Sequence, residues 1–158
     1  MRTGRSLRVV LNASPLIALA KLGVLEEALN LFSEAEVPYG VLKELSKKED
    51  EAYREVMKFV ATGKIRKEGI ERRLPRLGLG ESSAILLALN KGKVVVLDDK
   101  RARRLARELG LEVIGTLSIL KKLREEGVLK EEPNTIYLHL TRIGFHVSKK
   151  LFDKVFKE

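Results

Sequence analysis

The segment Lys93 to Leu97 (KVVVL) constrains the fold more than any other part of the chain. Its three consecutive valines favour a strand, and a run that is apolar on both faces is typical of the buried centre of a parallel sheet. Asp98 and Asp99 end this run, and the helical pattern KRARRLAREL follows directly. A strand that leads into a helix is the repeating unit of α/β proteins, so the chain is expected to belong to that class.

Shorter apolar runs repeat this alternation of strand and helix. Further strands are predicted at residues 7–11, 36–38, 64–70 and 111–115. Helices are predicted between and after them, with Ser14 and Thr116 as N-caps of the first and the last, over residues 15–22, 24–32, 38–48, 51–62, 81–90, 100–109 and 117–127. This order predicts an α/β/α sandwich around a central, mainly parallel sheet.

Residues 1–158 are expected to form a single domain, because a chain of this length can bury a hydrophobic core. Residues 1–130 make up the predicted α/β core. Residues 131–158 make up a predicted C-terminal helical appendage of two short amphipathic helices, which are separated by Gly144 and restarted at Ser148.

The composition excludes several kinds of chemistry. There is no cysteine, which rules out disulfides, thiol nucleophiles and zinc–thiolate sites. His139 and His146 lack a third partner, so they are expected at the surface rather than as metal ligands. No apolar stretch reaches membrane-spanning length, so no membrane association and a cytoplasmic location are expected. The absence of Trp and Gln, with abundant Lys, Arg and Glu, is typical of a thermophilic source.

The chain carries a formal net charge of +9. A basic surface attracts polyanions such as nucleic acids, although solvated Lys-rich faces are also common. The charge is concentrated in two clusters. Residues 100–107 hold five basic residues and no acidic one, and the second cluster comprises Lys64, Arg66, Lys67, Arg72, Arg73 and Arg76.

Polar residues follow the predicted strands, where the sites of open α/β sheets form. Asn12 follows the first strand, and Asp98 and Asp99 follow the central one. Glu44 lies about two turns into the helix after the second strand, and Glu81 lies in the first turn of the apolar helix. Clustered carboxylates repel one another unless a cation lies between them, and oxygen ligands favour Mg²⁺ or Mn²⁺. Together with the basic clusters, this pattern suggests phosphodiester hydrolysis.

Each of these residues also has a purely structural explanation. Glu81 suits a helix N-terminus because of the helix dipole, and Asp99 is a suitable N-cap for the helix that follows it. Glu44 can form an i,i+4 ion pair with Lys48. An Asn between a strand and a helix, such as Asn12, is an ordinary turn residue.

Four segments carry a family resemblance: VVLNASPLIALAKLG, VPYGVLKEL, LGLGESSAILLAL and VVVLDDKRARRLARELGLEVIGTLSILKKLREEGVL. In this order they resemble the PIN-domain family. The closing segment IGFHVSKKLFDKVFKE resembles the tail of a small prokaryotic PIN subfamily related to VapC-type toxins. The resemblance spans nearly the whole chain.

The resemblance implies a Mg²⁺- or Mn²⁺-dependent endoribonuclease that forms a homodimer, and the toxin branch of the family implies a small antitoxin as partner. Matched to the family pattern, Glu44, Glu81 and Asp99 are the expected catalytic acids, and Ser14 is expected to order the site. The expected metal ligands are Asn12, Glu44, Glu81, Asp98 and Asp99, with Asp99 favoured within the last pair. The residues expected to bind the nucleic acid are Lys100, Arg101, Arg103 and Arg104.

Asn12 departs from the family pattern, which has Asp at this position. An amide oxygen can ligate a metal, but the loss of one negative charge should weaken cation binding and water activation. The expected outcomes are a slow nuclease, an inactive descendant that still binds RNA, or an engineered or sequencing variant. The alternative to a nuclease is therefore a non-catalytic module that binds nucleic acid or an antitoxin in the same crevice. A scaffold that assembles through residues 133–158 is a third reading.

Overall fold

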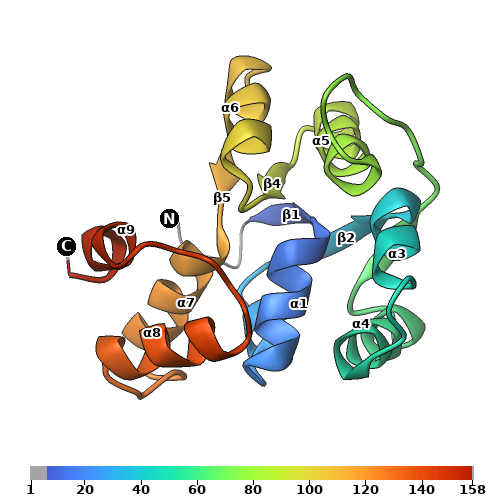
Figure 1. Ribbon diagram of the computed structural model, residues 1–158. Helices are drawn as coiled ribbons and strands as arrows, with labels where there is room; N and C mark the ends of the chain where they lie inside the picture. Colours follow the sequence, from blue (N-terminus) through green and yellow to red (C-terminus); the bar gives the residue numbers. More distant parts are fainter. Residues whose placement is uncertain (1–6, 158) are drawn as a thin grey trace.

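A five-stranded sheet forms the centre of the computed structural model, which describes residues 7–157 (Figure 1). Its strands are β1 (Arg8–Leu11), β2 (Glu34–Pro38), β3 (Arg66–Glu68), β4 (Val94–Val96) and β5 (Val113–Ile114). Their order across the sheet is β3-β2-β1-β4-β5, and every pair of neighbours is parallel. The three valines of β4 are all buried, as the run KVVVL predicted. The predicted α/β class with a parallel sheet is confirmed.

Helices cover both faces of this sheet. In Figure 1, α5 (Leu79–Lys91) and α6 (Lys100–Glu108) lie above the strands, and α1 (Ala13–Lys21) and α7 (Thr116–Glu125) lie below them. The remaining helices that precede α5 are α2 (Leu25–Leu29), α3 (Tyr39–Leu45) and α4 (Glu51–Ala61). The arrangement confirms the predicted α/β/α sandwich.

Two further helices, α8 (Pro133–Arg142) and α9 (Lys149–Phe156), follow α7 and lie beside it in Figure 1. Ser148 caps α9, because its Oγ accepts a hydrogen bond from the backbone N–H of Leu151 at 3.1 Å. Phe152 of α9 is fully buried and belongs to the same hydrophobic cluster as the strands. The C-terminal helices thus add to the core rather than only lying on it.

The sheet order fixes where a site can form. After β1 the chain adds β2 and β3 on one side, and it then returns to place β4 on the other side of β1. In such sheets the crevice lies at the carboxyl ends of the two strands where the direction reverses. Here the two strands are β1 and β4, and the backbone N–H of Asn12 donates to the carbonyl of Val96 at 3.2 Å. The residues that follow these strands are therefore neighbours.

A group of ion pairs lies between β2 and the start of β4. Glu36 is fully buried, and its carboxylate contacts the Nζ of buried Lys93 and, at 3.0 Å, the Nζ of Lys91. Lys93 also contacts Glu34 at 2.9 Å, and Lys91 contacts Glu68 at 2.7 Å. Burial alone would raise the pKa of Glu36, but hydrogen bonds to Glu68, Lys93 and Lys91 lower it to about 2. Removing either charge of the Glu36–Lys93 pair would leave the other buried without its partner.

The predicted N-caps of α1 and α7 are wrong by one or two residues. Asn12 occupies the N-cap of α1 and Gly115 that of α7, both with extended backbone. Ser14 and Thr116 lie inside the first turns, and their hydroxyls donate to Asp98. The preference of these residues for N-caps is overridden by this tertiary contact.

Among the described residues, 7–157, the structure contains no helix that is both long enough and apolar enough to span a bilayer.

Candidate active site

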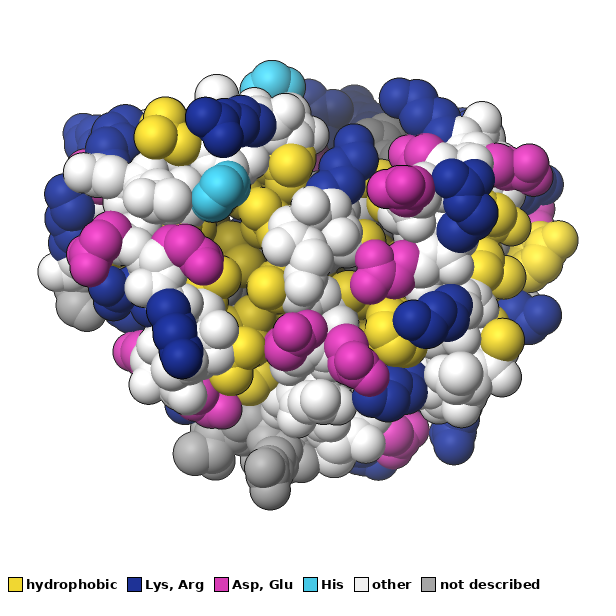
Figure 2. Space-filling view, turned by 90° about the horizontal axis from the view of Figure 1, so that it is seen from below, with side chains coloured by type: hydrophobic (Ala, Val, Ile, Leu, Met, Phe, Trp, Pro, Cys, Tyr) yellow, Lys and Arg dark blue, Asp and Glu magenta, His cyan; other side chains and the backbone are white. Residues whose placement is uncertain are grey.

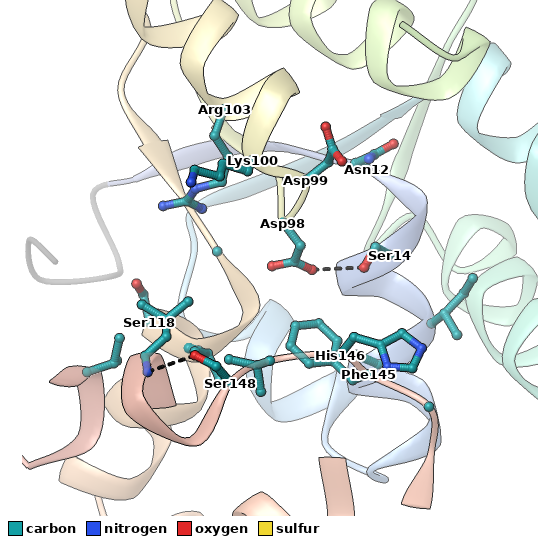
Figure 3. Close-up of a pocket in the computed structure, with 18 of the residues that line it drawn as sticks. Asn12, Ser14, Asp98, Asp99, Lys100, Arg103, Ser118, Phe145, His146 and Ser148 are labelled. Atoms are coloured by element: carbon teal, nitrogen blue, oxygen red, sulfur yellow. Dashed lines mark hydrogen bonds between the residues drawn. The ribbon is translucent and has the colours of Figure 1, made fainter. Parts of the chain in front are cut away.

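A pocket of about 770 Å³ opens at the carboxyl ends of β1 and β4 (Figure 3). Its polar side is lined by Asn12, Glu81, Asp98 and Asp99. These residues come from three different parts of the chain, and the sheet order brings them to one edge. Four of the five predicted metal ligands thus share a pocket, and Glu44 is the exception.

Asp98 is held by three donors. Its Oδ2 accepts from the Oγ of Ser14 at 3.0 Å and from the Oγ1 of Thr116 at 2.7 Å, and its Oδ1 accepts from the backbone N–H of Thr116 at 2.8 Å. Figure 3 shows the carboxylate turned toward Ser14. These bonds tie the end of β4 to α1 and α7, so Asp98 acts here as a brace of the strand end.

The carboxylates of Glu81 and Asp99 are close enough for their negative charges to repel each other. Burial raises the pKa of Glu81, and the negative charge of Asp99 raises it further. Each also serves a helix start: Asp99 Oδ2 accepts from the N–H of Ala102 at 2.9 Å, and Glu81 Oε1 accepts from the N–H of Gly78 at 3.4 Å. Capping therefore fixes the positions of two carboxylates whose charges repel each other.

Asn12 is only 5% exposed, and its Oδ1 is buried without a hydrogen-bond partner in the structure. A buried carbonyl oxygen without a partner is costly, and it suits a cation or a water molecule. Among residues 7–157, no three acidic or histidine side chains gather closely enough to hold an ion. Mg²⁺ commonly keeps several waters and binds only one or two carboxylates. Glu81, Asp99 and the amide oxygen of Asn12 fit such a hydrated ion.

Glu44 does not line the pocket but caps α5 from the neighbouring helix α3. Its Oε1 accepts a hydrogen bond from the backbone N–H of Gly80 at 2.8 Å. A Cβ at Gly80 would lie 2.8 Å from Glu44 Oε2, so glycine is required for this approach. The charge of Glu44 also contributes to raising the pKa of Glu81. Glu44 therefore acts on Glu81 indirectly, by holding the start of α5 and by its charge.

Replacing Glu44 with Ala is expected to lower the free energy of unfolding by about 1 kcal/mol, because the substitution removes a cap of α5. Chemical denaturation measures this change. Lys48→Ala is the matched control, since Lys48 is the i,i+4 partner that the sequence offers to Glu44. Equal losses in the two variants would mean that Glu44 acts through Lys48 and not through Gly80.

Basic residues line a second hollow of about 620 Å³ on the other side of the acid pair. Arg76, Arg101 and Arg104 contribute to it, and Lys100 borders both hollows together with Glu81 and Asp99. Arg76 has a φ of 67°, an uncommon conformation for a residue other than glycine.

Arg103 differs from the other basic residues of α6. Its Nη1 donates to the backbone carbonyl of Leu97 at 2.6 Å, and burial lowers the pKa of the guanidinium. A Cβ at Gly115 would lie 2.7 Å from Nη1, so glycine makes room for this side chain. Its predicted contact with nucleic acid would therefore be made from inside the first pocket.

The molecule does not present one continuous basic face in the view of Figure 2. Lys and Arg side chains lie mostly around the edge there, with acidic side chains among them, and hydrophobic side chains gather in a hollow near the middle. On this face the basic side chains are interspersed with acidic ones, so the observation that favours nucleic acid is the local cluster of the second hollow.

The C-terminal segment 143–148 forms a wall of the first pocket that sequence reasoning missed. Phe145, His146 and Val147 line the pocket, and Figure 3 shows the two rings on the side opposite Asp99 and Arg103. His146 is exposed, as predicted, yet it borders the site. No local pattern reveals this placement, because it depends on how α8 and α9 pack.

Comparison with known proteins completes the description. The profile of a family described as "PIN domain" matches residues 8–158. A solved structure, a PilT N-terminus domain protein from the hyperthermophilic archaeon Sulfolobus solfataricus, is similar with a TM-score of 0.48 and 15% identity, over 80% of this chain and 97% of that one. No protein of curated function matches the chain.

Proposed function

Because the chain belongs to the PIN-domain family, we propose that it is a Mg²⁺- or Mn²⁺-dependent endoribonuclease with a weakened metal site. The observation that carries the proposal is that Glu81, Asp99 and Asn12 line one pocket and that the Oδ1 of Asn12 is buried there without a hydrogen-bond partner. Two repelling carboxylates and a buried amide oxygen are suited to binding a hydrated cation. The family also supports nucleic acid as the partner.

The side chains divide the work in this proposal. Glu81, Asp99 and Asn12 hold the ion, which, when bound, lowers the pKa of a water and stabilises charge on the phosphodiester. Asp98, braced by Ser14, keeps the strand end in place. The basic residues of the second hollow position the RNA backbone through phosphate contacts, which fix register without reading sequence. The positions of these groups are set by α1, α5 and α6.

A second candidate function rests on Asn12 itself. With a neutral residue at this position the pocket has one negative charge fewer than the family pattern, and a non-catalytic module that binds RNA or an antitoxin explains that loss. If the chain is the toxin of a toxin–antitoxin pair, its toxic activity would be the proposed nuclease activity. An antitoxin would place an Arg or Lys between Glu81 and Asp99, where a charge-assisted pair forms.

Asn12→Asp is expected to raise RNA cleavage in Mn²⁺ by about tenfold or more, because ligand charge tunes the affinity of oxygen sites for divalent cations. The initial rate on a single-stranded RNA measures the effect. Asn30→Asp, which adds the same charge at an exposed position, should leave the rate unchanged. If Asn12→Asp cleaves RNA and the parent does not, the parent is a non-catalytic binding module. If Asn12→Asp and the parent cleave at the same rate, Asn12 does not hold the ion.

A further inference from the structure

We propose that the first pocket is a binding site for the base of one RNA nucleotide next to the scissile phosphate. This inference rests on the proposed function, because it assigns the acid pair to the phosphodiester. The C-terminal segment 143–148 and α9 would form the wall against which the base packs. The inference adds a subsite that the strand-end acids alone do not imply.

The two sides of the pocket differ in chemistry. Besides the acids, the lining is mostly apolar and includes Ile17, Leu117, Phe145, Val147, Leu151 and Val155, while the basic Lys100 and Arg103 and the ring of His146 also border it. Phe145 is half-buried, so its ring is held by the core while part of it is open to the pocket. At about 770 Å³ the pocket falls within the range of small-ligand sites, roughly 300–1,000 Å³. Bases bind proteins mainly by stacking on such aromatic rings.

The position of the acid pair connects this pocket to the basic hollow. Glu81, Asp99 and Lys100 border both. An RNA strand that crosses the border between the two hollows would have a phosphate beside Arg76, Arg101 and Arg104 in the second hollow. On the other side lies the first pocket, whose lining is mostly apolar, and a base is the least polar part of a nucleotide. The first pocket offers a phosphate only Lys100 and the half-buried Arg103, which already donates to a backbone carbonyl, whereas four basic side chains line the second hollow, so we place the phosphate in the second hollow and the base in the first pocket.

The base must leave its stack to enter the pocket, so the target nucleotide has to be unpaired. Its neighbours need not be read, because stacking accepts every base. The geometry thus predicts binding that depends on the presence of a base at one position and not on its identity.

Fluorescence anisotropy of a short single-stranded RNA, measured with EDTA so that no cleavage occurs, tests the proposal. Phe145→Ala is expected to weaken binding about tenfold, the effect of losing one stacked base. The same RNA made with abasic nucleotides should bind Phe145→Ala and the parent equally. Phe145→Leu keeps apolar volume without a ring, so its affinity for the RNA should lie between those of the parent and Phe145→Ala. Leu138→Ala, which removes an exposed apolar side chain outside the pocket, is the control.

The outcomes separate this proposal from the nuclease proposal. If Phe145→Ala binds both RNAs as the parent does, or loses affinity equally for both, the base site is wrong even where the parent cleaves RNA. If the base-dependent loss is seen but the parent and Asn12→Asp never cleave, the base site stands and the nuclease proposal falls. Circular dichroism of Phe145→Leu establishes that the comparison is made on folded protein.

Discussion

Replacing Glu81 with Gln is expected to lower RNA cleavage in Mn²⁺ by about a hundredfold or more, the range found when a group that acts directly on the reaction is removed. Gln keeps the size of the side chain and can still accept the hydrogen bond from Gly78 through its Oε1. It removes the charge that, with Asp99, is proposed to hold the ion. The initial cleavage rate at the Mn²⁺ concentration that saturates the parent measures the loss.

The loss cannot be attributed to unfolding. Because the pKa of Glu81 is raised in the folded protein, its ionised form costs stability at neutral pH, and Gln removes this cost. Gln also loses the favourable interaction with the helix dipole, so we expect the free energy of unfolding to stay within about 1 kcal/mol of the parent. Glu27→Gln, in the first turn of α2, is the matched control. If Glu81→Gln cleaves RNA as fast as Glu27→Gln, Glu81 has no role in catalysis.

Lys93→Met is expected to lower the free energy of unfolding by about 3 kcal/mol or more, the typical cost of removing one partner of a buried ion pair. The side chain of Lys93 is 4% exposed and that of Glu36 is 0% exposed. Without Lys93, Glu36 keeps Lys91 as an ion-pair partner, and the side chain of Lys91 is 31% exposed. Urea denaturation at neutral pH measures the change.

The controls distinguish charge from packing. Lys64→Met removes a solvent-exposed pair with Glu26 and should leave stability nearly unchanged. Combining Lys93→Met with Glu36→Leu should recover much of the loss, because neither charge is then left buried. A loss in Lys93→Met no larger than in Lys64→Met would contradict the account of this pair.

The pH dependence of the same parent–variant difference follows from the pKa of Glu36, which folding lowers from 4.5 to about 2. A lowered pKa means that the unfolded state binds more protons in this range. The stabilisation is therefore fully present above pH 4.5 and is lost as the pH falls toward 2. The difference in the free energy of unfolding between the parent and Lys93→Met should therefore become smaller as the pH falls from 4.5 toward 2.

The architecture could be predicted from the sequence because its signals are local. The valines of β4 and the strand-to-helix alternation depend only on burial and periodicity, and both are confirmed. The rule that sites form at strand ends placed Asn12, Asp98 and Asp99 at one edge, which is where the structure has them. Strand order supplied what the sequence lacked, namely which ends are neighbours.

The errors concern contacts between distant residues. Ser14 and Thr116 were assigned as N-caps, but their hydroxyls bind Asp98 across 84 and 18 positions. The sequence offers Lys48 as an i,i+4 partner of Glu44, whereas in the structure Glu44 caps α5. Phe145 was not singled out, because its place in the pocket depends on the packing of α8 and α9. Propensity and spacing describe a residue's neighbours in the chain, and these four contacts lie outside that range.

A titration of RNA cleavage against Mn²⁺ tests whether Asn12, Glu81 and Asp99 hold a catalytic ion. The parent, Asn12→Asp and Glu81→Gln are compared on one single-stranded RNA over the same range of Mn²⁺ concentration. We expect metal-dependent cleavage by the parent, saturation at lower Mn²⁺ in Asn12→Asp, and no saturable cleavage in Glu81→Gln. Cleavage by the parent that is independent of Mn²⁺, or equal metal dependence in all three proteins, would contradict this expectation.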